Sequence, residues 1–164
     1  MNYDIYHSSI TYFPLLPLSK TASFECKVLD IRQMPAQVLF PHWDDEFEFI
    51  YVLSGMMEFR VRQKAFLVSS GEGFFLNTGE IHSACAYQSY DCRFVIYRIC
   101  PSVLFQTEDN PLYQKYIKPM VDHPSFGFLT FVPKVPWQKY ILEMIRKIND
   151  ICERPVDGYE LKIN

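Results

Sequence analysis

The amino-acid sequence predicts a mainly β fold, a sandwich or a barrel, followed by helices toward the C-terminus. Between residues 24 and 99, short runs rich in Val, Ile, Phe and Tyr alternate with turn residues. After Pro101 the apolar residues recur at helical spacing instead. The chain has 164 residues, and 49% of them are hydrophobic. This suffices for one core with an appendage, and a second full domain is not expected.

Residues 1–23 mix Tyr, Ser, Thr and Pro, and Pro14 and Pro17 forbid a continuous helix. An extended arm is therefore expected there. The predicted strands after it are residues 24–31, 38–40, 47–53, 56–62, 66–68, 73–76, 81–87 and 93–99. A tight hairpin is predicted at residues 53–56, because Gly55 supplies the positive φ of such a turn. Further turns are expected at residues 70–73 and 77–80.

Two helices are expected after the strands, at residues 112–122 and 137–153. The second carries a narrow apolar stripe, like a coiled-coil seam, formed by Ile141, Ile145, Ile148 and Cys152. We interpret the stripe as a dimerisation surface. Packing on the chain's own strands is the alternative, because Tyr140, Met144 and Ile151 would broaden the apolar face. Residues 158–164 look like the start of a further helix, so we expect the chain to be the front part of a longer protein.

Composition narrows the classes of partner. Sixteen Lys and Arg oppose nineteen Asp and Glu, which gives a formal charge of −3, so this portion lacks the positive field that draws proteins onto nucleic acid. Its five cysteines include no CxxC pair, and no secretory signal precedes them, which favours a cytoplasmic protein with reduced thiols. No run approaches the ~20 apolar residues of a membrane span.

Four polar side chains in or beside the predicted strands could meet at one end of a small barrel: His42, Asp44, Glu48 and His82. Three interpretations stay open for them. They could hold a divalent metal such as Mn, Fe, Ni or Zn, contact a small polar ligand, or form a structural polar network. The aromatic candidates for stacking on a sugar or an aromatic ligand are Trp43, Tyr51, Phe59, Phe75 and Tyr97, with core packing as the alternative.

The motifs around these residues resemble those of the cupin superfamily. The first cupin motif is G-x5-H-x-H-x3-E-x6-G; His42, Glu48 and Gly55 match it, whereas Ala36 replaces Gly and Asp44 replaces the second His. The second motif is G-x5-P-x-G-x2-H-x3-N; Gly71, Gly79 and His82 match it, whereas Asn77 replaces Pro and Ala86 replaces Asn. Three of the four usual metal-ligand positions are therefore intact.

One stretch points to a narrower group than the cupin superfamily. It is similar to the sensor domain of AraC-type bacterial transcription regulators, and it reads His42-Trp43-x-Asp45-Glu46-Phe47-Glu48-x-Ile50-Tyr51-Val52-Leu53-x-Gly55. Residues 114–119, the helix led by Trp137 and residues 158–163 resemble the helical dimerisation segment of the same regulators. The resemblance covers about residues 36–164. It implies a cupin-like double-stranded β-helix (jelly-roll) barrel that binds a small effector, often a sugar, and helices that pair two subunits.

The sequence pattern and the resemblance together predict an arm (1–23), a cupin barrel (24–105) and a helical dimerisation segment (106–164). DNA would be bound only by a C-terminal domain with helix-turn-helix motifs, which this chain does not contain. No catalysis and no cofactor are expected, because family members commonly use the barrel without a metal. The rival is a metal-dependent cupin enzyme, a small oxygenase or sugar isomerase, with His42, Asp44, Glu48 and His82 as ligands. A third reading is a dimerisation scaffold without a ligand.

Overall fold

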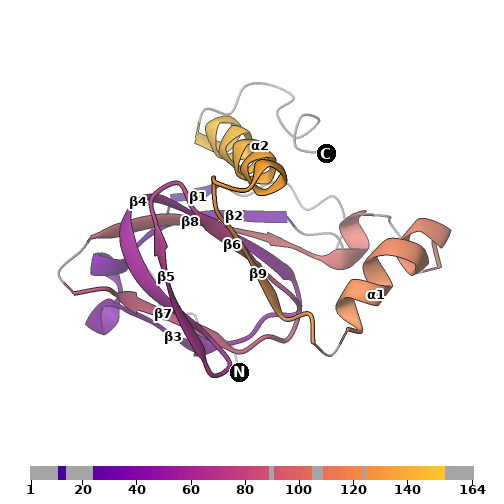
Figure 1. Cartoon of the computed structure of the whole chain (residues 1–164), viewed down its shortest axis with the longest axis horizontal. Coiled ribbons are helices and arrows are strands. Elements are labelled where there is room, and N and C mark those ends of the chain that lie inside the picture. The colour runs from indigo at the N-terminus through magenta and orange to yellow at the C-terminus, as the bar shows by residue number, and fades with distance from the viewer. Residues whose placement is uncertain (1–10, 14–23, 89–90, 105–108, 124, 154–164) are drawn as a thin grey trace.

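The computed structural model describes residues 11–13, 24–88, 91–104, 109–123 and 125–153. The strands form a barrel with a long helix across one side (Figure 1). They are β1 (Thr11–Phe13), β2 (Phe24–Asp30), β3 (Val38–His42), β4 (Phe47–Val61), β5 (Lys64–Ser69), β6 (Gly73–Leu76), β7 (His82–Ala86), β8 (Cys92–Ile99) and β9 (Phe128–Phe131). The predicted mainly β architecture is confirmed.

Two antiparallel sheets build the barrel, and β4 belongs to both. One sheet has the order β1-β2-β8-β4-β6-β9, and in the other β7 pairs with β3 and β4 while β5 pairs with β4. The N-terminal part of β4 pairs with β8 and β6, and its part from Met56 onward pairs with β5 and β7. A strand that changes sheets in this way closes the barrel at a corner.

The hairpin predicted at residues 53–56 is wrong, because β4 runs through these residues without reversing. Gly55 does have a positive φ, 80°. A Cβ at this position would lie 1.5 Å from the carbonyl oxygen of Asp91. Glycine is therefore needed where the bending strand passes close to another backbone, which is a use of glycine that sequence alone does not separate from a turn.

Alternate residues of the first sheet face two different apolar clusters. Ile50, Phe94 and Ile96 belong to the cluster inside the barrel, together with residues of the second sheet such as Phe59. Val95 and Tyr97 belong to a second cluster on the outer side of the first sheet. This alternation follows from the two-residue period of a β-strand. It means that the first sheet is apolar on both faces and needs a cover on its outer face.

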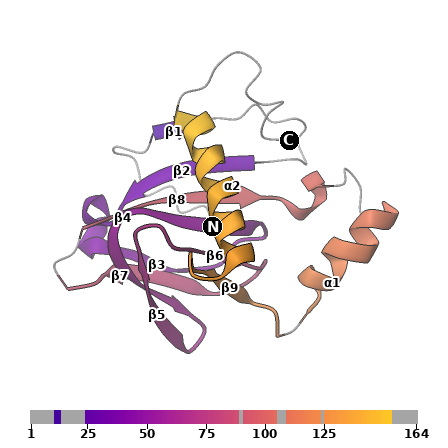
Figure 2. The ribbon, with the colours of Figure 1, turned by 45° about the horizontal axis from the view of Figure 1, so that its top comes forward.

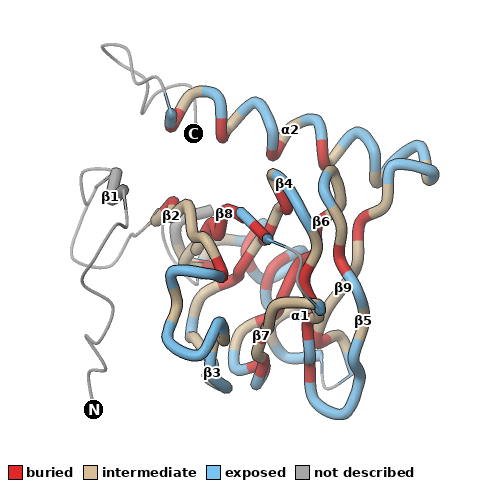
Figure 3. The backbone as a smooth tube through the Cα atoms, turned by 90° about the vertical axis from the view of Figure 1, so that its left-hand side faces the viewer, coloured by how far each residue is buried: buried red, intermediate tan, exposed pale blue. Residues whose placement is uncertain are grey.

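Helix α2 (Pro136–Glu153) provides that cover and confirms the helix predicted at 137–153. It lies across the outer face of the first sheet (Figure 2). Its buried positions face the strands (Figure 3), and they are Leu142, Ile145, Asn149 and Cys152. Ile141 and Ile148 are partly buried in the same cluster. Two of the four residues predicted for dimerisation, Ile145 and Cys152, thus pack fully on the chain's own barrel.

The helix predicted at residues 112–122 is present as a π-helical turn, Tyr113–Ile117, followed by α1 (Lys118–Val121). β9 was not expected and adds a strand to β6 from within the segment predicted to be helical. Its four residues, Phe128–Phe131, do not alternate between apolar and polar side chains, so the sequence does not predict a strand there. Within the described residues, no helix is long and apolar enough to cross a membrane.

The predicted arm falls mostly outside the described residues, as does the element expected at 158–164. The described part of the arm is β1, whose residues pair antiparallel with Cys26, Lys27 and Val28 of β2. The division of the chain at residues 23 and 105 stays a prediction.

Candidate functional site

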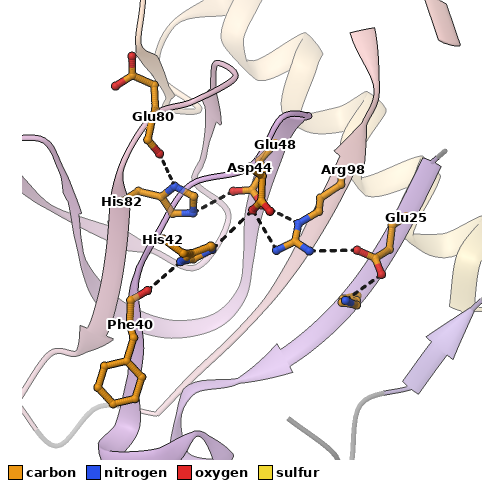
Figure 4. A network of polar contacts seen from close by, with 9 residues as sticks. Glu25, Phe40, His42, Asp44, Glu48, Glu80, His82 and Arg98 are labelled. Carbon is orange, nitrogen blue, oxygen red and sulfur yellow. Dashed lines mark hydrogen bonds and ion pairs between the residues drawn. The ribbon is translucent and has the colours of Figure 1, made fainter. Parts of the chain in front are cut away.

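Four polar residues from three parts of the chain meet at one end of the barrel (Figure 4). His42 ends β3 and His82 begins β7, and the two residues are paired in the ladder between these strands. Their rings lie 4.2 Å apart between centroids. Glu48 is the second residue of β4, and Asp44 lies in the connection before it. One ligand atom from each of the four lies within 4.8 Å of all the others. We call these four residues the quartet.

Each imidazole of the quartet is oriented by a backbone carbonyl two residues before it. His42 Nδ1 lies 2.8 Å from the carbonyl oxygen of Phe40, and His82 Nδ1 lies 2.8 Å from that of Glu80. A carbonyl oxygen only accepts, so each Nδ1 donates its proton. The Nε2 atoms are thereby turned toward the centre of the quartet, where each offers a lone pair when its ring is neutral.

A fifth residue, Arg98 on β8, joins the quartet to the neighbouring strand. Its Nε donates to Glu48 Oε1 at 2.8 Å, and its Nη2 lies 3.2 Å from Asp44 Oδ2. Its Nη1 donates to Glu25 Oε2 on β2 at 3.3 Å, and Lys27 Nζ lies 2.8 Å from Glu25 Oε1. The arrangement follows from register, because Arg98 is paired with Glu25 on one side and Glu48 on the other.

Sequence reasoning missed Arg98, although a usable signal existed. Phe94 and Ile96 face the barrel interior, so the two-residue period places position 98 on the same side. A charged side chain at an inward position of an apolar strand requires a partner of opposite charge. Identifying that partner requires the strand order, which a single sequence does not provide.

Four buried atoms of the quartet have no hydrogen-bond partner: His42 Nε2, Asp44 Oδ2, Glu48 Oε2 and His82 Nε2. His82 Nε2 and Glu48 Oε2 lie 3.0 Å apart, and His42 Nε2 and Asp44 Oδ2 lie 3.7 Å apart. Each approach is a close contact between an imidazole nitrogen and a carboxylate oxygen, and it becomes an ion pair when the histidine is protonated. Buried polar atoms in folded proteins are usually paired with protein groups, water or an ion, so this cluster is the candidate site of the described residues.

The environment shifts the pKa values of the quartet in different directions. Burial alone would raise the pKa of Glu48, but His82 and Arg98 outweigh it and lower the pKa to about 2. Burial raises the pKa of Asp44 to about 6 against the opposing effect of Arg98. Burial and the neighbouring His82 lower the pKa of His42. Burial would lower the pKa of His82 as well, but Glu48 outweighs it and raises the pKa. Perturbations of this kind are frequent at functional sites.

The donor set of the quartet suits a divalent cation. Two imidazole nitrogens and two carboxylate oxygens are typical ligands of Mn, Fe or Zn, and the four unpartnered atoms point to a common centre. Arg98 opposes such binding, because its guanidinium already contacts both carboxylates. The residues could therefore hold a metal by their type and position, although the charge around them is partly balanced without one.

The aromatic residues predicted to line the site are spread over three places. Phe59 is buried inside the barrel, and its ring stacks on His82 with 5.6 Å between centroids. Trp43 is adjacent in sequence to His42 and Asp44 but 56% exposed. Tyr51 and Tyr97 lie in the cluster on the outer face of the first sheet, so they are not brought to the quartet. Tyr97 instead donates to the carbonyl oxygen of Ile145 on α2 at 3.4 Å.

Tyr51 and Tyr97 were predicted to contact the ligand, and the strand period explains why they lie on the outer face instead. Each lies an odd number of positions from a residue of the site on its own strand, Glu48 or Arg98, and therefore points to the opposite face. Phe75 also lies in the outer cluster. The alternative of core packing holds for these three residues.

Comparison with known sequences identifies the family. Residues 27–147 match the sequence model of the AraC-like ligand binding domain. The chain belongs to this family. The family match and the two-sheet barrel together confirm the expected cupin-like fold. The chain is 29% identical over 122 residues to YdeC of Bacillus subtilis (strain 168), which is described as an uncharacterized HTH-type transcriptional regulator. The match covers 74% of this chain and 41% of YdeC, so the AraC-like domain spans less than half of that relative.

Solved structures similar to this AraC-like domain include two that are described as cupins. The cupin domain of Schizosaccharomyces pombe Cnp3 has a TM-score of 0.45 at 16% identity and covers 55% of this chain and 62% of that one. A cupin-2 domain protein of Shewanella frigidimarina has a TM-score of 0.39 at 19% identity, over 45% and 68% of the two chains. The polyketide cyclase RemF of Streptomyces resistomycificus has a TM-score of 0.43 at 21% identity, over 61% and 80%.

Proposed function

We propose that this AraC-like domain senses a small, uncharged, hydroxyl-rich effector, such as a sugar, at the quartet and has no catalytic activity. The observation that carries the proposal is the convergence of imidazole and carboxylate atoms of the quartet at one end of the barrel of a ligand-binding domain. Hydroxyl groups suit these atoms, because a hydroxyl can donate to an imidazole nitrogen or a carboxylate oxygen and can also accept. Neutral ligands of this kind need no countercharge.

The exposure of the quartet supports entry from one side. The side chains of His42 and Asp44 keep 28% and 23% of their accessible surface, whereas Glu48 and His82 keep 2% each. Apolar side chains, Phe59 among them, fill the barrel interior beside the site. An effector would therefore contact His42 and Asp44 first and would reach Glu48 and His82 with the part that enters furthest.

Regulation would follow from linkage in the whole protein. We propose that a C-terminal helix-turn-helix domain binds DNA, as the name of YdeC suggests for that relative. An effector changes DNA binding only if its affinity differs between two arrangements of the domains. Such a regulator acts on DNA in the cytoplasm, which is the location we propose for it.

We also propose that two copies pair through α2, but not mainly through the predicted stripe. Ile145 and Cys152 contact the chain's own barrel, whereas Trp137 and Tyr140 on the same helix are 51% and 62% exposed. A partner would therefore cover the outward face of α2. Sedimentation of the domain at high micromolar concentration should give a dimer, and W137S/Y140S should give a monomer; a monomeric parent would contradict the proposal.

The second candidate is a metal-dependent cupin enzyme, which the convergence of the four unpartnered atoms favours. In that case His42, Asp44, Glu48 and His82 would hold the ion, which would supply Lewis-acid activation of a bound oxygen or carbonyl. Arg98 argues against this candidate, because its guanidinium already contacts both carboxylates of the quartet.

The effector proposal is tested by thermal unfolding of the domain with a panel of pentoses and hexoses at millimolar concentration. A ligand that binds the folded state raises the melting temperature. We expect one or more sugars to raise it for the parent domain and for His123→Ala, which removes a histidine outside the site, but not for His42→Ala. A shift that persists in His42→Ala would place binding elsewhere, and no shift with any sugar would refute the proposed class of effector.

A further inference from the structure

We propose that Arg98 determines which ligands the quartet accepts: its guanidinium is a fixed internal cation that balances the carboxylates of Glu48 and Asp44 and thereby disfavours a divalent metal ion at the site. This inference rests on the proposed function for the nature of the ligand, but its test does not use an effector.

The contacts of Arg98 show why it acts as a counterion for the whole site. It contacts Glu48 through Nε at 2.8 Å and Asp44 through Nη2 at 3.2 Å. These two residues supply all the negative charge of the quartet. The buried carboxylate of Glu48 would be costly without a cation nearby. Arg98 offsets that cost from β8, and through Nη2 it also contacts Asp44 Oδ2, one of the four quartet atoms without a hydrogen-bond partner.

A divalent ion at that centre would share an oxygen with Arg98. Asp44 Oδ2 lies 3.2 Å from Arg98 Nη2 and 3.7 Å from His42 Nε2. An ion coordinated by this oxygen would therefore lie close to the guanidinium, in a partly buried region where charges are poorly screened. Repulsion between a double and a single positive charge at such a distance reduces affinity on the order of 100-fold or more. A neutral hydroxyl-rich ligand does not meet this repulsion.

Arg98 cannot move away to admit an ion without breaking other contacts. Glu25 accepts a hydrogen bond from Nη1 on the side opposite the quartet, and Glu25 is held in turn by Lys27. The three carboxylates that contact Arg98 come from β2, from β4 and from the connection before β4. Because the planar guanidinium presents its donors in a fixed fork, all three contacts hold it in one orientation. The cation is therefore part of the framework of the site.

The test compares the affinity of the domain for Zn²⁺ and for Mn²⁺, after treatment with a chelator, in the parent and in variants at position 98. Arg98→Met and Arg98→Gln remove the charge, and Arg98→Lys keeps it. Arg93→Met is the matched control, because Arg93 is an exposed arginine on the same strand. Titration calorimetry gives the dissociation constants, and circular dichroism gives the folded fraction of each variant.

We expect Arg98→Met and Arg98→Gln to gain affinity for Zn²⁺ on the order of 100-fold, while Arg98→Lys and Arg93→Met stay near the parent. Adding His82→Ala to Arg98→Gln should abolish the gain, which would place the ion at the quartet. If removing the charge only disturbed the fold, Arg98→Met and Arg98→Gln would lose metal affinity instead of gaining it. Arg98→Gln keeps hydrogen-bond donors, so it decides the question if Arg98→Met does not fold.

Two results would overturn the inference. One is tight stoichiometric Zn²⁺ or Mn²⁺ binding by the parent domain, because Arg98 would then not exclude a metal. The other is a folded Arg98→Gln variant with the metal affinity of the parent. If the inference about Arg98 fails, the proposal of a sugar effector is unaffected, because the thermal unfolding that tests it uses no metal. Failure of the sugar panel likewise leaves the metal titrations valid.

Discussion

Tyr97 and Arg98 are neighbours on β8, yet they belong to two regions held together by different forces. Tyr97 faces α2 in an apolar cluster, where its one polar contact is to a backbone carbonyl. Arg98 faces the quartet, where its contacts are to three carboxylates. The α2 interface is stabilised by apolar area removed from water, in proportion to that area. The site depends on charges that are favourable only as a complete set.

The difference predicts two kinds of response to substitution. In the apolar interface, removing one side chain costs the area and the cavity that it leaves. In the site, removing one partner leaves others buried without compensation, so a single change affects several residues. The following predictions separate these responses.

The largest effect is expected for Glu48→Ala. It removes the carboxylate that contacts both Arg98 and His82, and breaking a buried ion pair from one side costs about 3–5 kcal/mol. Glu58→Ala is the matched control on the same strand, since Glu58 pairs with the exposed Arg60 on the outside and its loss should cost about 0–1 kcal/mol. Urea unfolding measures both. Equal free energies of unfolding for the two variants would contradict the claim that the charges of the site stabilise the fold only when all of them are present.

A smaller effect is expected for Ile145→Ala in the α2 interface. The side chain is buried against the outer face of the first sheet, and truncating a buried isoleucine costs about 2–4 kcal/mol. Arg146→Ala, at the next and exposed position, should change the free energy of unfolding by less than about 0.5 kcal/mol. Urea unfolding in low and high salt should give the same loss for Ile145→Ala. A strong dependence on salt would mean that charges hold α2 in place.

The smallest effect is expected for pH, because protonation leaves the side chains in position. The pKa of Glu48 is lowered from 4.5 to about 2, so its share of stability is present above pH 4.5 and is lost as the pH falls through about 2. The pKa of Asp44 is raised from 3.8 to about 6, so its share is fully present below pH 3.8 and is lost as the pH rises through about 6. The two windows overlap, so together these groups favour the folded state most at about pH 4.

Substitutions separate the two windows. Asp44→Asn should remove the decline in the free energy of unfolding between pH 4 and pH 6, as measured by urea unfolding across that range. Ile145→Ala should instead lower the free energy by a similar amount at every pH in this range, because no ionisable group is involved. If Asp44→Asn kept the decline, another group would be responsible for it.

Much of the fold and part of the site could be predicted from the sequence. Strands and helices were placed because periods of two residues and of about three and a half are local patterns. The sequence predicts that His42, Asp44, Glu48 and His82 lie together, because all four fall at motif positions, and the structure brings them together. The bend at Gly55 was misread, since the approach of the Asp91 backbone is a contact between distant segments. Arg98 was missed for the same reason, because its partners lie on strands β2 and β4.

The central place of β8 also has a consequence for synthesis on the ribosome. β8 lies between β2 and β4 in the sheet, and Ile99 is paired with both Phe24 and Phe47. Glu48 precedes Arg98 by 50 residues, so the first half of the barrel waits roughly 3–10 s for its middle strand at ordinary rates of elongation. During that time β2 and β4 present open edges, which are the surfaces most prone to mispairing. A truncated chain that stops before β8 cannot complete the first sheet, so the barrel becomes stable only once about three fifths of this sequence has been made.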